Sequence, residues 1–191
     1  MAASYKVVFT GPPGSGKSTA VQTLSDIAVL QTEATASDAL CALKPSTTVA
    51  MDYGLMKLPN GDKVHLYGTP GQRRFDFMWE ILRRDAKGLV LLVSATAVDP
   101  VADLRLFCSE FRPFIDTNGL VVGVTHADQS RQDMAATLMS ALQQQGIAPR
   151  VMDADARNRT HMAVLVESLI FSRAVVPGLA ETARRTTSSP I

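Results

Sequence analysis

The feature that most constrains this chain is residues 11–18, GPPGSGKS, which match the phosphate-binding P-loop pattern G-x-x-x-x-G-K-[ST]. Residues 5–10 before this segment are rich in β-branched and aromatic side chains, which predicts a buried strand. After it, apolar residues recur at helical spacing, which predicts a helix over residues 18–27. A strand, a glycine-rich turn and a helix in this order form the context in which the motif binds phosphate.

The composition of this loop indicates how it would hold a polyphosphate. Pro12 and Pro13 have no N–H group, so the backbone donors must come from residues 14–18, near the positive end of a helix. Lys17 would reach the β- and γ-phosphates, and the Ser18 hydroxyl would bind Mg²⁺. The predicted phosphate-binding residues are Gly11, Gly14, Ser15, Gly16, Lys17, Ser18 and Thr19.

Length and composition limit the kind of protein further. The 191 residues suit one domain, expected over residues 1–176, with a polar tail over residues 177–191. A net charge of +1 predicts no strong attraction to nucleic acid or to an anionic membrane. We find no signal peptide, transmembrane run or lipidation motif, and we expect a cytoplasmic monomer. Cys41 and Cys108 are too few for a disulfide framework or a metal site.

Strand-like and helix-like segments alternate along the rest of the chain. A hairpin is expected at residues 49–67, with its turn at residues 59–62. The remaining predicted strands are 89–93, 120–124 and 151–152, and the remaining helices are 73–84, one beginning at 99–100, 130–145 and 160–171. The polar segment 30–47 is expected to be a loop. The pattern predicts an α/β fold of the P-loop NTPase class, with a six-stranded, mostly parallel sheet and helices on both faces.

Two short motifs follow the last two predicted strands: Thr125-His126-Ala127-Asp128 and Asp155-Ala156-Arg157. There the chain resembles the Ras-like small GTPases, whose guanine-recognition motifs are N/T-K-x-D and S-A-K. The resemblance implies that Asp128 accepts the two guanine N–H groups and that the Ala156 N–H meets the guanine carbonyl. His126 replaces the usual Lys and would stack on the base. The alternative for Asp128 is a helix cap.

The resemblance extends to the two switch segments. Thr48, or alternatively Thr47, resembles the first-switch threonine that binds Mg²⁺, although either residue could simply begin a strand. In the second switch, Gly71 would donate to the γ-phosphate and Gln72 would orient the attacking water. Arg73 or Arg74 is a candidate internal arginine finger, the alternative being solvated charges.

Gly68 departs from the pattern, because the family places there the acidic residue that fixes the Mg²⁺ water shell. The sequences TVAMDYG at residues 48–54 and GTPGQ at residues 68–72 resemble those of a bacterial branch of these GTPases, that of the gliding-motility GTPase and its relatives. We expect weak Mg²⁺ binding and slow unaided hydrolysis, unless another residue such as Asp52 replaces the missing carboxylate.

The predicted helix 73–84 has more apolar surface than one buried face needs, with Phe75, Met78, Trp79 and Leu82 on one stripe. It is a candidate surface for a protein partner, and the resemblance implies a small roadblock-type activator. The alternative is that the sheet and a neighbouring helix cover this surface. We assign no functional role to His65 or His161.

Taken together, these patterns predict a GTP/GDP switch that binds Mg²⁺, hydrolyses GTP slowly and acts through a protein partner. Two alternatives remain. One is a GTP-holding scaffold with negligible hydrolysis, for which Gly68 is the main support. The other is a P-loop kinase acting on a small molecule.

Overall fold

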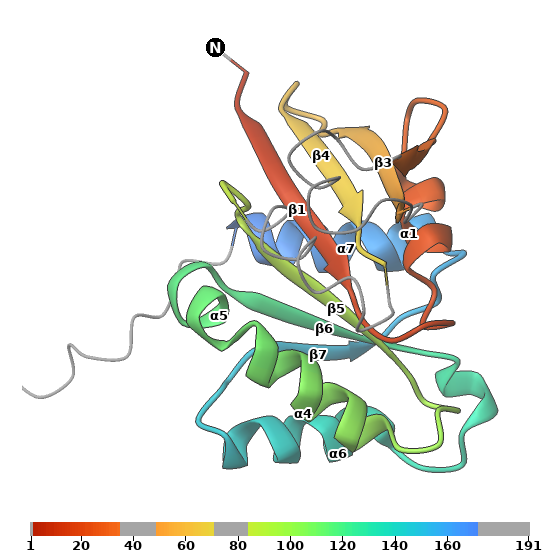
Figure 1. The fold of residues 1–191 in the computed structure, drawn as a ribbon, viewed down its shortest axis with the longest axis vertical. Coiled ribbons are helices and arrows are strands. Elements are labelled where there is room, and N and C mark those ends of the chain that lie inside the picture. The colour runs from red at the N-terminus through yellow and green to blue at the C-terminus, as the bar shows by residue number, and fades with distance from the viewer. Residues whose placement is uncertain (1, 35–48, 71–83, 172–191) are drawn as a thin grey trace, which may run out of the picture.

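A seven-stranded sheet with the strand order β2-β3-β4-β1-β5-β6-β7 forms the centre of the fold (Figure 1). The computed structural model describes residues 2–34, 49–70 and 84–171. Within them the strands are β1 (Ser4–Thr10), β2 (Leu30–Ala34), β3 (Val49–Lys57), β4 (Lys63–Gly68), β5 (Gly88–Ser94), β6 (Leu120–Thr125) and β7 (Arg150–Asp153). Strands β2 and β3 are antiparallel to their neighbours, and the other pairings are parallel.

Helices cover both faces of this sheet. Strands β5 and β6 are buried along their whole length, as their continuous apolar runs predict for parallel strands covered on both sides. The first layer lies in front of the sheet in Figure 1 and the second behind it, and each encloses its own apolar core. The first layer is α4 (Pro100–Glu110), α5 (Arg112–Asn118) and α6 (Met134–Gln144), and the second is α1 (Lys17–Leu24) and α7 (Arg159–Phe171).

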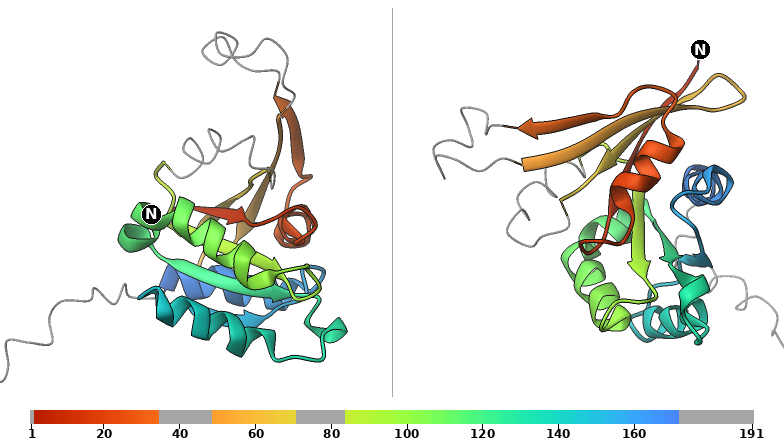
Figure 2. Two further views of the ribbon diagram at one scale, coloured as in Figure 1. Left: turned by 60° about the horizontal axis from the view of Figure 1, so that its bottom comes forward. Right: turned by 90° about the vertical axis from the view of Figure 1, so that its right-hand side faces the viewer.

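The antiparallel strands β2 and β3 lie at the opposite end of the sheet from α4 and α6 (Figure 2). The parallel strands β1, β5, β6 and β7 all run in one direction, so their carboxyl ends meet at one edge. In α/β sheets of this kind, ligands bind at that edge. The P-loop follows β1 there, and the two candidate base motifs follow β6 and β7.

The predicted α/β fold class is confirmed, and so are the hairpin of β3 and β4 and the helix expected to begin at 99–100. This helix is α4, and the Asp99 carboxylate caps it by accepting a hydrogen bond from the Ala102 N–H at 2.9 Å. The predicted loop at residues 30–47 is wrong for its first part, because Leu30–Ala34 pairs with Val49–Tyr53 as a seventh strand. Polar side chains at an edge strand left no apolar alternation to detect.

Two predicted helix boundaries also differ from the structure. Helix α1 ends at Leu24, and Ile27 is 40% exposed outside it, because Ser25 and Asp26 accept hydrogen bonds from the backbone of β3. The helix predicted from residue 130 begins at Met134, where the Asp133 side chain caps it by accepting from Ala136 N at 2.9 Å.

Candidate nucleotide-binding site

The P-loop backbone adopts conformations that its glycines make possible. Gly11, Gly14 and Gly16 all have positive φ, at 138°, 75° and 95°, a region that residues with a side chain rarely occupy. At Gly11 a Cβ atom would also collide with the Leu92 carbonyl oxygen, and at Gly16 it would lie 2.9 Å from the Ala156 Cβ. Glycine is therefore required at Gly11 and Gly16 by space as well as by backbone angle.

Lys17, the first residue of α1, is 7% exposed and folds back onto the loop. Its Nζ donates to the Pro12 carbonyl oxygen at 2.7 Å. Burial lowers the pKa of Lys17 from 10.5 to about 8, while the negative charge of Asp52 acts in the opposite direction. A buried cation of lowered pKa at this position is suited to receiving an anion, because a phosphate would restore its preference for the charged form.

Ser15 and Thr125 join the P-loop to the carboxyl end of β6. The Thr125 hydroxyl donates to the Ser15 carbonyl oxygen at 3.1 Å, and both residues are buried. The Thr125 side chain thus holds the P-loop against the end of β6, which precedes the candidate base motif, and its role in nucleotide binding stays a prediction.

His126 follows Thr125 in a left-handed conformation with φ 55°. Its Nδ1 lies 3.0 Å from the Ser94 hydroxyl at the end of β5. This contact fixes the ring beside the pocket, where we predicted that it replaces the usual lysine.

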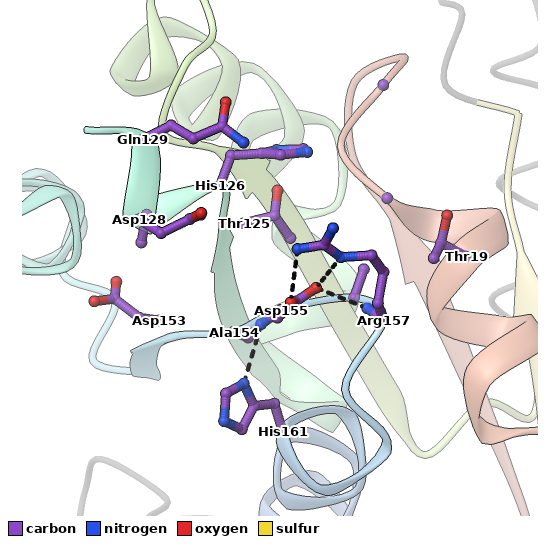
Figure 3. Close-up of a pocket in the computed structure, with 14 residues that line it drawn as sticks. Thr19, Thr125, His126, Asp128, Gln129, Asp153, Ala154, Asp155, Arg157 and His161 are labelled. Carbon is purple, nitrogen blue, oxygen red and sulfur yellow. Dashed lines mark hydrogen bonds and ion pairs between the residues drawn. The ribbon is translucent and has the colours of Figure 1, made fainter.

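An open pocket of about 750 Å³ lies between these segments (Figure 3). Asp128 and its neighbours lie on one side of it and Thr19 of α1 on the other. The pocket is lined by residues from the P-loop and α1 (Gly14, Gly16 and Thr19), from the segment after β6 (125–129), from the segment after β7 (153–157), and by His161.

Asp128 belongs to a short 3₁₀ helix, η2 (Ala127–Gln129), and is exposed at the pocket. The alternative that it caps the next helix is wrong, because Asp133 caps α6. The Asp155 carboxylate is the main cause that raises the pKa of Arg157, and the charge of Asp128 adds to it.

Asp155 and Arg157 organise the loop after β7. The Arg157 guanidinium donates to both carboxylate oxygens of Asp155 at 3.0 Å and lowers the pKa of Asp155 to about 2. Between them, Ala156 is 7% exposed and lies against the P-loop glycine Gly16. The structure thus brings this motif to the pocket, as predicted.

His161 is the residue that the sequence analysis missed. Its Nδ1 accepts a hydrogen bond from the Asp155 N–H at 3.2 Å, and its side chain lines the pocket (Figure 3). The helix-start position gave no signal of this contact. His161 lies six residues after Asp155, and the two meet because the chain turns between the end of β7 and the start of α7.

The backbone after β4 is attached to the end of β1. Thr69 donates from its N–H to the Phe9 carbonyl oxygen at 2.9 Å, and its hydroxyl donates to that of Thr10 at 3.1 Å. Gly68 is thereby placed beside the beginning of the P-loop, as the resemblance requires. The other predicted switch residues, Thr47, Thr48, Gly71, Gln72, Arg73 and Arg74, lie outside the described residues, as does the candidate partner helix at 73–84.

The residues described near the P-loop fit a Mg²⁺ ion bound with a nucleotide. Ser18 is exposed at the first turn of α1, and the carboxylate of Asp52 interacts with Lys17 from the neighbouring hairpin. Hydroxyl and carboxylate oxygens, together with phosphates and water, are the ligands that Mg²⁺ prefers. Bound there, the ion would neutralise phosphate charge.

A glycine-rich phosphate loop joined to a base pocket at the carboxyl edge of a mostly parallel sheet defines a P-loop nucleotide-binding protein. The chain belongs to the 50S ribosome-binding GTPase family, whose model matches residues 6–115. It is therefore a P-loop GTPase, a class of protein that binds guanine nucleotides.

Two individual proteins are also similar to the chain. The G domain of the T. maritima FeoB iron transporter has a TM-score of 0.62 and 18% identity, over 87% of this chain and 97% of that domain, so the similarity concerns the fold. An uncharacterized protein of Methanocaldococcus jannaschii is 30% identical over 92 residues, which are 48% of this chain. The match spans about half of that relative, 51% of its length.

Among the helices in the part of the chain that the structure describes, none is both long and apolar enough to cross a membrane.

Proposed function

We propose that this protein is a GTP/GDP switch that binds Mg²⁺ and hydrolyses GTP slowly. The observation that carries the proposal is the hydrogen bond between Thr125 and Ser15, which couples the loop for phosphates to the segment for the base. One ligand that has both a polyphosphate and a purine would fill the pocket from Thr19 to Asp128.

The chemistry of Asp128 supports guanine in preference to adenine. A carboxylate accepts two hydrogen bonds side by side, and guanine presents two adjacent N–H donors. Adenine offers no such pair, so it would leave the carboxylate without one partner. Membership of a GTPase family supports the same choice.

Hydrolysis and switching rest on the second-switch motif of the sequence. Gln72 would orient the attacking water, and loss of the γ-phosphate would release both switch segments. We propose that a protein partner binds the helix after Gln72 and accelerates turnover, and that the protein acts in the cytoplasm. The resemblance to the bacterial gliding-motility branch is part of this proposal and stays a prediction.

The experiment compares binding and turnover of labelled GTP, GDP and ATP by the full chain. We expect tight binding of GTP and GDP, weak binding of ATP, and slow GTP hydrolysis that Gln72→Leu lowers without changing affinity more than a few fold. Equal binding of ATP would contradict guanine specificity. Phosphate transfer from ATP to a small acceptor would favour the kinase alternative, and tight GTP binding without any hydrolysis would favour the scaffold.

A further inference from the structure

Asp52 on β3 lies directly opposite Gly68 on β4, the position where the resemblance predicts an acidic residue. A Cβ atom built on Gly68 would lie 3.0 Å from Asp52 Oδ2 and 3.1 Å from Asp52 Cβ. The Asp52 side chain therefore already occupies the space beside Gly68 into which a side chain at that position would extend.

The backbone of Gly68 does not itself call for glycine. Its φ is not among the positive φ values of the glycines, unlike those of the P-loop. The neighbouring Asp52 side chain is what leaves little room for a side chain there. Asp52 therefore carries on β3 the carboxylate that the family pattern places on β4, at the position paired with it.

Asp52 also lies at the end of the hairpin that is nearest to the start of the P-loop. The residue after Gly68 is bonded to the last residues of β1, immediately before the P-loop. Asp52 is paired with Gly68, and Gly68 is paired with Phe9 near the end of β1, so Asp52 lies in register with the end of the strand from which the P-loop begins. Ser18, the last residue of the P-loop motif, carries the hydroxyl expected to bind the metal.

We propose that Asp52 supplies, from the neighbouring strand, the carboxylate that Gly68 lacks, and that it holds the water shell of the Mg²⁺ ion bound with the nucleotide. This inference rests on the proposed function, because it assumes a nucleotide–Mg²⁺ complex in the pocket. Mg²⁺ keeps several of its waters in such sites and is commonly held through one or two carboxylates together with phosphates. Asp52 is thus a positioning residue, which acts on the metal ion through its bound waters.

The test measures release of a fluorescent GDP analogue from the full chain while free Mg²⁺ is titrated from EDTA to millimolar concentrations. In the parent, Mg²⁺ should slow release with a defined midpoint. Asp52→Asn keeps the shape and removes the charge, so it should raise the Mg²⁺ midpoint by about 10–100-fold, as loss of a carboxylate around a metal site typically does. Binding in EDTA should change little.

An exchange of the two residues makes the test specific. Asp52→Gly combined with Gly68→Asp should return the midpoint to within a few fold of the parent, whereas Asp52→Gly alone should not. Gly68→Asp alone adds a second carboxylate beside the first, with its Cβ 3.0 Å from Asp52 Oδ2, and should lower the melting temperature without tightening Mg²⁺ binding. Asp62→Asn is the matched control, because Asp62 is on the same hairpin but bonds to Ala3 N at the opposite end of the strands.

Three results would overturn the inference. An unchanged Mg²⁺ midpoint in Asp52→Asn would show that the carboxylate does not act on the metal. A loss of GDP binding by Asp52→Asn that is the same in EDTA and in Mg²⁺ would show that Asp52 serves only Lys17. Failure of the parent itself to bind GDP would contradict the proposed function, and this inference with it, which distinguishes the two proposals.

Discussion

Single side chains decide what a pocket selects, and Asp128 is the residue to which we assign recognition of the base. It is exposed and lines the pocket together with Arg157. Because Asp133 caps α6, Asp128 is not needed as the cap of that helix. A substitution there should therefore affect the ligand more than the fold.

Replacement of Asp128 by Asn should weaken GDP binding by about 2–3 kcal/mol, the value of hydrogen bonds to a charged group. Binding of xanthosine diphosphate should improve, because xanthine has an acceptor where guanine has its amino group. Asp133→Asn is the control: it removes an acidic charge nearby, and Asn is as good a helix cap as Asp. GDP binding by Asp128→Asn equal to that of the parent would contradict the base-site assignment.

Lys17 predicts a pH dependence for nucleotide binding. Its pKa of about 8 in the free protein should rise when phosphates bind, so binding takes up a proton near that pH. GDP affinity should therefore fall about threefold between pH 7.5 and pH 8.5, measured by calorimetry in two buffers that differ in ionisation enthalpy. The stability of the ligand-free protein should change in the opposite direction. The pKa of Lys17 is 10.5 in the unfolded chain and about 8 in the folded protein, so between these pH values the unfolded chain binds more protons. The contribution of Lys17 to the free energy of unfolding therefore increases as the pH rises above about 8.

Lys17→Arg provides the control for this prediction, because an arginine stays charged over the same pH range. Its GDP affinity, although different in magnitude, should not depend on pH in that window. A parent affinity that is the same at both pH values would show that Lys17 is already charged in the free protein.

At the scale of elements, the P-loop helix is held at its far end by α7. Arg159 donates to the carbonyl oxygens of Leu24 at 2.8 Å and Thr23 at 3.1 Å, and its guanidinium lies 2.7 Å from Asp26. These carbonyls belong to the last turn of α1, where a helix has no internal donors and carries partial negative charge. One side chain thus joins the first helix to the last.

Arg159→Ala should lower the free energy of unfolding by about 1 kcal/mol, since the ion pair is partly exposed and most of the loss comes from the uncapped carbonyls. Urea denaturation followed by circular dichroism measures this. Arg105→Ala is the matched control, because Arg105 makes an exposed 3.3 Å contact with Gln144 and should be nearly neutral. Equal effects of the two variants would show that the cap contributes nothing.

At the scale of the whole molecule, the sheet separates two cores, and each is closed by helices distant in sequence. Cys108 of α4 is 0% exposed in the first core, and burial raises its pKa to about 11. A thiol that is both inaccessible and protonated reacts only when the molecule opens. It is therefore a probe of global stability.

In a Cys41→Ser background, where Cys108 is the only thiol, iodoacetamide at pH 8 should label the folded protein slowly and the urea-unfolded protein rapidly. GDP at 100 times its dissociation constant should slow labelling a further ~100-fold, because ligand binding stabilises the folded state by mass action. Mass spectrometry follows the modified fraction. Rapid labelling of the folded protein would contradict the burial of this thiol.

Much of this fold could be predicted from local pattern. The P-loop, the apolar runs of β5 and β6 and the Asp99 cap are each specified by residues within a few positions of one another. Their order along the chain then predicted the sheet edge at which the site lies. The sequence determined these features because hydrophobic period, glycine backbone freedom and capping act between near neighbours in the chain.

The tertiary structure decided what depends on distant partners. Residues 30–34 are a strand only because β3 offers them a free edge, and Ile27 is exposed because β3 draws the chain out of α1. His161 joins the pocket because α7 folds back under the loop after β7. The same holds for Asp52 and Gly68. The sequence marked Gly68 as a departure from the family pattern and named Asp52 as a possible substitute, but only strand register places the two residues opposite each other, because hydrogen-bonded pairing relates residues that are distant in the chain.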